Sequence, residues 1–339
     1  MTAMTTFAKL FEPLPVGGRT ARNRIVHAPM SVCYGDENGY VTRPEVEHYG
    51  RRAKGGAGIV ITENFAVNWP GRQMPRQTMV DNESRLPGLS ELASEIKRHG
   101  ALAMVQLVHA GRYAGPWEVY HHARRLAPSA VPFELTAGRV ETPHEISPEE
   151  IAESIAAFGR AAQLCDQAGF DGVDVHGAQG FLISEFLSPV MNQRTDEWGG
   201  SFANRVRFAL EVVREVRRRT SPQFLVGFHL LSDELTGNSW TIKDAVQLAP
   251  LLAAEGVQFL FGIPATFESL RMPPNVGLFK RRMYSVPDNA ALEHADGALD
   301  VIRTCPDDPP ICARTQLFGA VCDHWPPEVT RDGYFGYQA

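Results

Sequence analysis

The sequence contains no run of 18 or more apolar residues, which is about the length that a helix needs to cross a membrane. Its first residues, MTAMTTFAKLFEPL, do not combine a positively charged start with an apolar stretch, so they do not resemble a secretory signal peptide. We therefore expect a protein that neither crosses a membrane nor carries an export signal, and we expect it in the cytoplasm.

Cysteine is scarce, with five in 339 residues, and no two of them form a CxxC pair. An odd number of widely spaced cysteines argues against a disulfide framework and fits a reducing compartment. Cys305, Cys312 and Cys322 lie closest together, but their spacing matches no common metal-binding template. We predict no metal site.

An excess of positive charge is also missing, since 33 Lys and Arg residues stand against 39 Asp and Glu residues, a net charge of -6. Proteins that bind nucleic acid through its phosphates usually carry a basic surface, so no nucleic-acid partner is predicted. The apolar share of 44% and the charged share of 21% are ordinary for a globular enzyme that acts on a small molecule. Whether the chain forms a homo-oligomer stays open.

Short apolar runs alternate with helical patterns along most of the chain. Nearly continuous apolar runs of this length are typical of parallel strands that are covered on both faces. The predicted strands are 24–30, 58–63, 102–107, 172–176, 224–230, 257–263 and 310–313.

Helix signals lie between these strands. Ser147, Pro148 and Glu150 form a capping box with proline at the first helical position, and Thr241 precedes a second helical pattern. Each of these helices passes into a strand within a few residues, as in a parallel βα repeat. No GxGxxG follows the first strand, which counts against a dinucleotide-binding sheet.

The predicted fold class is α/β, a TIM-type (β/α)8 barrel that is incomplete or atypical at strands 7–8. We expect one domain over residues 1–339, in which 116–144 is a loop or an inserted subdomain and 305–339 is an atypical segment. Barrel active sites lie at the carboxyl ends of the strands.

Polar side chains follow several of the predicted strands. Ser31 offers a hydroxyl after the first strand, and the Gln106 amide, in the third, can donate and accept hydrogen bonds at once. His176 and Gln179 follow the fourth strand, where they could hold a carbonyl or phenolate oxygen. Each residue alone has an ordinary structural explanation, and only the combination points to a site.

Four ordered motifs resemble signatures of the Old Yellow Enzyme family. They are NRIVHAPM at 23–30, RRAKGGAGIVITE at 51–63, VQLVHAGR at 105–112 and FLSPVMNQRTDEWGGSFANRVRF at 186–208. The resemblance extends from about residue 10 to about residue 269. In the last motif, we expect Arg194, Asp196 and Arg205 to form a buried ion-pair network that fixes the loop.

The resemblance implies a barrel that binds FMN, accepts hydride from NAD(P)H and passes it to an activated alkene. By position, Pro29, Met30 and Ser31 would line the flavin, and Gln106 would bond to its pyrimidine edge. His176 would bond to the activating oxygen of the substrate. The hydride chemistry belongs to the cofactor, whereas the protein orients and polarises.

The chain departs from the family pattern at four places. Gln179 stands where His or Asn is usual, and Phe181 replaces a tyrosine that commonly supplies a proton. His229 replaces an arginine expected near flavin N1, so it is a candidate both for cofactor binding and for catalysis. Beyond residue 305 we find no glycine-rich Gly-Arg loop for the phosphate and no convincing eighth strand.

These features support one leading hypothesis and two alternatives. The first is an FMN-dependent, ene-reductase-like oxidoreductase of secondary metabolism that uses NAD(P)H on a conjugated or oxidisable small molecule, with FMN bound weakly or lost. The second is a flavin-free barrel that catalyses cyclisation, isomerisation or elimination on a polyunsaturated metabolite through His176, Gln179 and His229. The third is a non-catalytic homologue.

Overall fold

A parallel sheet forms the centre of the computed structural model, which describes residues 8–116, 121–136, 138–271 and 300–301. Neighbouring strands are all parallel and follow the order of the chain, as a barrel wall requires. The strands are β3 (Val26–His27), β4 (Ile59–Ala66), β5 (Leu102–Val108), β10 (Gly172–Gly177), β11 (Leu225–Leu231), β12 (Phe259–Ile263) and β13 (Asp300–Val301).

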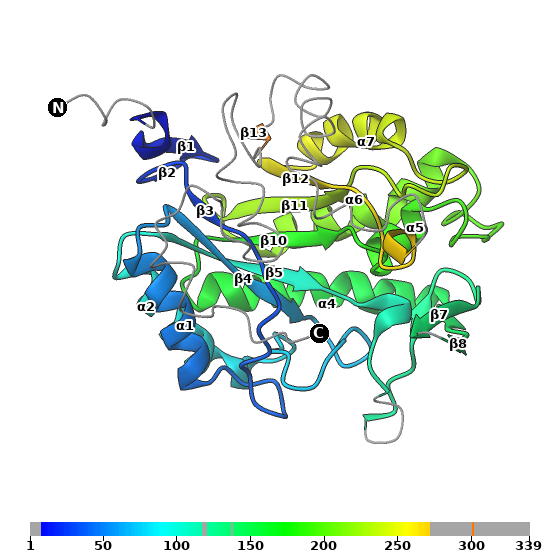
Figure 1. The fold of residues 1–339 in the computed structure, drawn as a ribbon, viewed down its shortest axis with the longest axis horizontal. Coiled ribbons are helices and arrows are strands. Elements are labelled where there is room, and N and C mark those ends of the chain that lie inside the picture. The colour runs from blue at the N-terminus through cyan, green and yellow to red at the C-terminus, as the bar shows by residue number, and fades with distance from the viewer. Residues whose placement is uncertain (1–7, 117–120, 137, 272–299, 302–339) are drawn as a thin grey trace.

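A helix follows each of the strands from β3 to β11, and the helices pack on one face of the sheet (Figure 1). They are α1 (Arg43–Lys54), α2 (Leu86–Lys97), α4 (Pro148–Gln167), α6 (Phe202–Arg219) and α7 (Ile242–Ala254). The predicted capping box is present at the start of α4, where Ser147 accepts from the Glu150 backbone and Glu150 accepts from the Ser147 backbone. The helix signals in the sequence are therefore confirmed here.

Side chains on each strand alternate between the helices and the interior. In β10, Val173 and Val175 join the large core cluster beneath the helices. Asp174 and His176 therefore project to the opposite face. On that face a smaller apolar cluster, which includes Met104 and Phe259, fills the amino-terminal part of the barrel.

A short hairpin covers the amino-terminal end of the strands. It consists of β1 (Leu14–Val16) and β2 (Arg19–Ala21), and its apolar residues belong to the smaller cluster. The hairpin sits at the left of the sheet in Figure 1, away from the carboxyl ends of β5 and β10. A site with polar side chains is therefore expected at the opposite end of the barrel, where the strands have their carboxyl ends.

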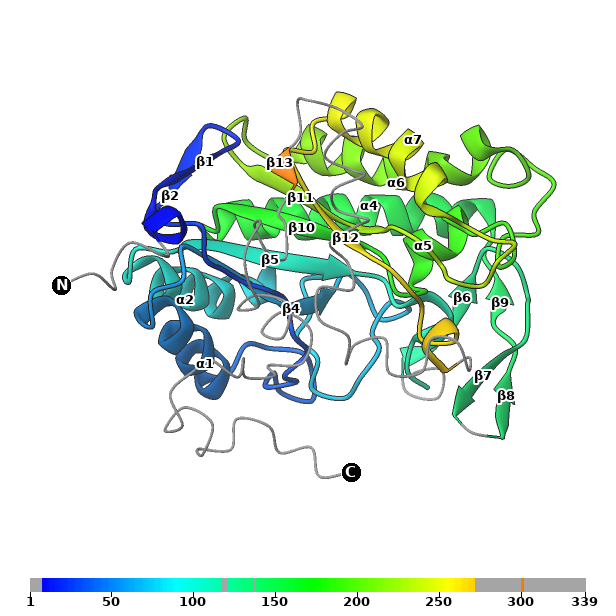
Figure 2. The same cartoon turned by 45° about the horizontal axis from the view of Figure 1, so that its top comes forward.

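The segment after β5 contributes small strands at the carboxyl end of the sheet. Near them lies α5 (Leu182–Leu187), as both views show (Figure 2). The small strands are β6 (Leu126–Ala127), β7 (Phe133–Thr136), β8 (Arg139–Glu141) and β9 (His144–Glu145). Single 3-10 turns complete the described elements: η1 (Ala8–Phe11), η2 (Glu83–Arg85), η3 (Gly111–Tyr113) and η4 (Ser269–Arg271).

The strand predictions hold for most of the sheet, with differences at the two ends. β3 is shorter than the predicted 24–30, since Pro29 has no N–H to continue a ladder. The predicted strand 310–313 lies outside the described residues, and β13 was not predicted. No helix in the described part of the chain is long and apolar enough to cross a membrane.

Candidate functional site

Three neighbouring strands bring the predicted site residues together on the interior face. In the register of the sheet, Gln106 on β5 lies opposite Asp174 on β10, and His176 lies opposite His229 on β11. All four side chains are buried. The apolar cluster fills the barrel on their amino-terminal side. This polar group therefore lies toward the carboxyl ends of the strands, where barrel active sites are found.

Asp174 is the centre of this polar group. Its Oδ2 atom lies 2.8 Å from Nε2 of Gln106 and 2.6 Å from Nδ1 of His229. Its Oδ1 atom is buried and has no hydrogen-bond partner among the described residues. Sequence reasoning missed Asp174, although an acidic residue at an interior position of an otherwise apolar strand was a usable signal.

His176 is arranged as a neutral hydrogen-bond donor. The Ala178 backbone N–H donates to its Nδ1 at 3.3 Å, so in the neutral ring Nε2 carries the proton. Burial lowers the pKa of His176 well below its usual range, and the neighbouring His229 lowers it further. A neutral imidazole N–H can polarise a carbonyl oxygen without charging the cavity.

Gln179 lies beside His176, as the sequence suggested. A hydrogen bond with Gln179 acts on the pKa of His176 against the lowering by burial. Gln179 has a φ of 61°, a left-handed conformation that is uncommon outside glycine, and it forms a bridge with Thr266 beyond β12. The loops after β10 and β12 are thus joined at this residue.

Phe181 closes the site with an aromatic wall. Its ring contacts His176 edge-on at 4.8 Å between centroids, and it packs near Tyr113 and Phe267 at 6.3 Å and 5.6 Å. The side chain is only 1% exposed. The position that would carry a tyrosine hydroxyl in the family pattern is therefore apolar and shielded from water.

The loop with Pro29, Met30 and Ser31 lies beyond β3 and is more accessible than the group around Asp174. Pro29 and Met30 are half-buried and Ser31 is exposed. The Ser31 hydroxyl donates to Oδ1 of Asn64 on β4, at a long 3.4 Å. The structure therefore keeps these three residues at the edge of the interior rather than within the polar group.

A buried carboxyl pair fixes this loop from behind. The backbone N–H groups of Val32 and Cys33 donate to Glu63 at 2.8 Å and 2.9 Å, just where β4 shifts its register against β5. Glu45 of α1 lies beside Glu63 and accepts from the Thr78 hydroxyl at 2.8 Å. Nothing in the sequence indicates that these two glutamates contact each other.

Both carboxyl groups of the pair favour their protonated forms. Burial raises the pKa of Glu63 to about 7, against the opposing hydrogen bonds from Cys33 and Val32. Burial also raises the pKa of Glu45, which lies well above its usual range, and the charge of Glu63 adds to that effect. Two carboxylates in one dry site cannot both be ionised at low cost.

The expected ion-pair network after strand β10 forms only in part. Arg194 pairs with Asp196 at 2.6 Å, as predicted. The inclusion of Arg205 was wrong, because its guanidinium donates to the carbonyls of Leu187 and Gly200. Backbone acceptors, which sequence patterns do not reveal, replace the carboxylate there.

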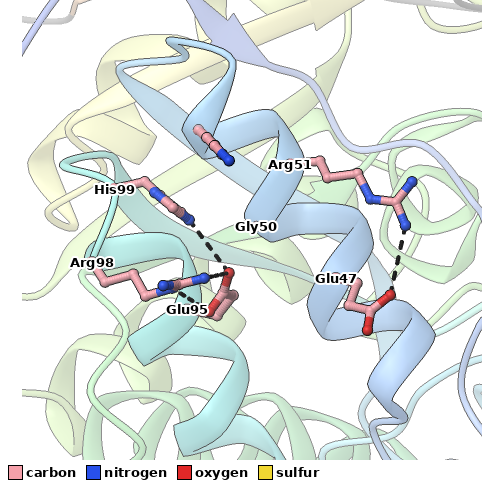
Figure 3. Close-up of a pocket in the computed structure, with 7 residues that line it drawn as sticks. Glu47, Gly50, Arg51, Glu95, Arg98 and His99 are labelled. Atoms are coloured by element: carbon pink, nitrogen blue, oxygen red, sulfur yellow. Dashed lines mark hydrogen bonds and ion pairs between the residues drawn. The ribbon is translucent and has the colours of Figure 1, made fainter.

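A second hollow lies far from these strand ends, between α1 and α2 (Figure 3). Its charged residues are largely paired with one another: Glu95 contacts Arg98 and His99, and Glu47 contacts Arg51. Exposed pairs of this kind contribute roughly 0–1 kcal/mol each. We assign no function to this hollow.

The sequence of this chain is similar to those of known proteins. Residues 9–295 match the model of the "NADH:flavin oxidoreductase / NADH oxidase family". An NADPH dehydrogenase of Bacillus cytotoxicus is 39% identical over 254 residues, which are 74% of this chain and 70% of that protein. An NADH oxidase of Thermoanaerobacter brockii is 35% identical over 268 residues, 79% of this chain but only 41% of that protein.

Solved structures of similar fold support the same family. A 2-naphthoyl-CoA reductase complex superposes with a TM-score of 0.81 at 28% identity, covering 86% of this chain and 46% of that one. An old yellow enzyme homologue from Zymomonas mobilis has a TM-score of 0.67 at 27% identity, covering 76% and 73%. The barrel fold class and the resemblance drawn from the four motifs are thereby confirmed. The chain spans less than half the length of two of these relatives.

Proposed function

The chain belongs to the NADH:flavin oxidoreductase / NADH oxidase family, and on that premise we propose that it is an FMN-dependent oxidoreductase of Old Yellow Enzyme type. The proposed reaction takes hydride from NAD(P)H and delivers it to a conjugated or oxidisable small molecule. The observation that carries the proposal is the neutral donor His176, held two residues beyond Asp174 on the same face of β10.

The residues present fit the ring end of FMN. The group of Gln106, Asp174 and His229 offers donors and acceptors at two successive levels of the sheet, and the buried Oδ1 atom of Asp174 still lacks a donor among the described residues. Such an atom is costly unless a ligand or water supplies the missing hydrogen bond. When bound, the flavin would supply the hydride chemistry. Pro29, Met30 and Ser31 would then contact it from the loop after β3.

The protein's own part in the reaction centres on His176. Its Nε2–H would donate to the activating oxygen of the substrate, with Gln179 beside it. Phe181 has no proton to give, so reduction of an alkene must take its proton from water, or the enzyme must work in the direction of dehydrogenation, which needs no such acid. The aromatic wall around Phe181 would present an apolar surface to that side of the substrate.

We further propose that FMN binds less tightly than the family pattern would suggest. The support lies in the sequence, because residues 305–339 contain no glycine-rich Gly-Arg loop for the phosphate. Hydrogen bonds to charged groups contribute roughly 1.5–3 kcal/mol each, so the loss of two or three corresponds to about 10³–10⁴ in dissociation constant.

One pair of measurements tests both statements. The visible spectrum of the purified protein, followed by anaerobic addition of NADPH, shows whether a flavin is bound and reduced. Fluorescence titration of the apoprotein with FMN then gives the affinity. A protein that binds no FMN even at millimolar concentration contradicts the proposed function, whereas a nanomolar dissociation constant contradicts only the weak binding. The family and its relatives do not favour the flavin-free or non-catalytic alternatives.

We also propose a cellular setting for the protein. Five scattered cysteines support a cytoplasmic protein, and no nucleic-acid partner is proposed for a chain of net charge -6. We also propose one domain over residues 1–339, in which 116–144 is a loop or an inserted subdomain and 305–339 is an atypical segment, and a place in secondary metabolism. Cell fractionation and light scattering would test the location and any homo-oligomer.

A further inference from the structure

One carboxylate oxygen serves two residues of the proposed site. Oδ2 of Asp174 accepts from Nε2 of Gln106 at 2.8 Å, and it lies 2.6 Å from Nδ1 of His229. All three residues are at most 4% exposed, so water does not compete for these contacts. The three residues come from β5, β10 and β11, which are neighbours in the sheet.

The chemistry of a carboxylate decides how its two partners are oriented. An ionised carboxylate only accepts hydrogen bonds, so Gln106 must turn its NH2 group toward Asp174, and His229 must carry its proton on Nδ1. The 3.2 Å contact between Gln106 Nε2 and His229 Nδ1 then brings together two donors that share one acceptor. What remains for a ligand is the Oε1 atom of Gln106 and the Nε2 atom of His229.

The surrounding rings hold His229 in this position. The strand partner of Asp174 on β11 is Gly227, where an added Cβ would come within 2.2 Å of the Phe259 ring. Phe259 therefore occupies the space that a side chain at 227 would take. Two residues further along each strand, Phe261 stacks on the His229 ring at 4.6 Å between centroids. Stacking fixes the plane of the imidazole, and Asp174 fixes its edge.

We propose that Asp174 is a positioning residue that sets which atoms Gln106 and His229 present at the strand ends. The ligand face then consists of acceptors, Oε1 of Gln106 and Oδ1 of Asp174, beside Nε2 of His229. A heterocycle with an imide-like N–H edge matches these acceptors, and the flavin ring is of this class. The identity of the ligand rests on the proposed function, but the orientation of the two side chains does not.

Nitrogen-15 NMR of the apoprotein with labelled histidine tests the proposal directly. The His229 signals are assigned by their loss in His229→Gln, and the ring nitrogens report the position of the proton. We expect the Nδ1–H form in the wild type. In Asp174→Asn, whose amide can donate or accept, we expect a mixture of both forms and a dissociation constant for FMN raised by about tenfold or more.

Asp171→Asn is the matched control. Asp171 directly precedes the same strand and is also buried, but it pairs with Arg19 and Lys97 at the amino-terminal end of the barrel. This variant should lower thermal stability and leave both the His229 signals and the FMN affinity unchanged.

Two results would overturn the proposal. One is an Nε2–H form of His229 in the wild type, which needs no variant to fold. The other is an unchanged His229 spectrum in folded Asp174→Asn. A wild type that shows the Nδ1–H form but never binds FMN would instead contradict the proposed function and leave the role of Asp174 standing.

Discussion

Glu63 on β4 and Asp174 on β10 are both shielded from water, yet different partners stabilise them. Glu63 accepts mainly from backbone N–H groups of the loop after β3 and faces a second carboxyl group, Glu45. Asp174 accepts from two side chains of the proposed site and has no acidic neighbour within hydrogen-bond distance among the described residues. One carboxyl group holds the backbone of a loop, and the other orients functional groups.

This difference indicates that Glu63 contributes to stability, whereas Asp174 contributes to the proposed site. Around Glu63 the proton is part of the structure, because two ionised carboxylates would repel each other in a dry site. Around Asp174 the accepting oxygen is part of the structure, because one acceptor orients both of its partners. We therefore expect changes on the β10–β11 side to alter turnover, and changes on the β3–β4 side to alter stability and its dependence on pH.

The largest expected effect comes from restoring a proton donor on the β10–β11 side. Phe181→Tyr should raise NADPH-dependent reduction of 2-cyclohexenone by about 10²–10⁴-fold, the usual contribution of a well-placed general acid. Phe267→Tyr, in the same aromatic group, is the control and should give no gain. Equal rates for Phe181→Tyr and the wild type would show that residue 181 is not where the proton is delivered.

Removing the donor beside it should act in the opposite direction. His176→Ala should lower kcat/KM by at least about tenfold, because a hydrogen bond to a developing charge contributes roughly 1.5–3 kcal/mol. His109→Ala is a suitable control, since His109 is also buried and also accepts a backbone N–H at Nδ1. Turnover per folded molecule should be unchanged in the control, and loss of activity in both variants would mean that packing alone is responsible.

On the β3–β4 side the expected effect is a pH-dependent stability. The pKa of Glu63 is about 7 in the folded protein and about 4.5 in an unfolded chain. Its contribution to stability is therefore complete below about pH 4.5 and is lost as the pH rises through about 7, by an amount on the order of 3 kcal/mol, since one pKa unit corresponds to about 1.36 kcal/mol. Urea unfolding at a series of pH values measures this decline.

Two isosteric variants distinguish the members of the pair. Glu63→Gln cannot ionise, so it should remove the part of the decline that levels off near pH 7. Folded Glu45 keeps its proton well above its usual range while the unfolded chain loses it, so Glu45→Gln should remove the part of the decline that continues above pH 7. If Glu45→Gln instead removed the part that levels off near pH 7, the group that titrates there would be Glu45, and our assignment of the proton would be reversed.

The smallest effect is expected outside both regions. Arg98→Ala removes a charge from the hollow between α1 and α2, where Arg98 and its partner Glu95 are surface groups. The free energy of unfolding should change by less than about 1 kcal/mol, and FMN affinity should stay the same. A loss of FMN affinity in this variant would show that the hollow between α1 and α2 affects cofactor binding, contrary to our expectation.

Much of the fold was predictable from local patterns. Parallel strands buried on both faces read as continuous apolar runs, and the capping box at Ser147 fixed the start of α4 to the residue. His176 and Gln179 were predictable as neighbours because His176 lies at the end of a strand and Gln179 follows it closely. These features depend on residues close together in the sequence.

Other features depend on contacts between distant residues and could not be predicted in this way. Asp174 meets Gln106 across 68 positions, and the Glu45–Glu63 contact depends on how α1 packs against β4. Arg205 was assigned a carboxylate partner because charge patterns are visible in a sequence and backbone carbonyls are not. In all three cases the partners are determined by tertiary packing rather than by composition.

The hairpin of β1 and β2 has a consequence for how the chain folds as it is synthesised. Arg19 donates to the Gln223 carbonyl, and the Gly17 carbonyl accepts from Gln258, contacts that span 204 and 241 positions. The first strands must therefore wait until most of the chain has left the ribosome before their partners exist. Contacts this distant slow folding, and until they form, the apolar residues that they cover stay exposed. Nascent chains should therefore depend on chaperones until β12 has emerged.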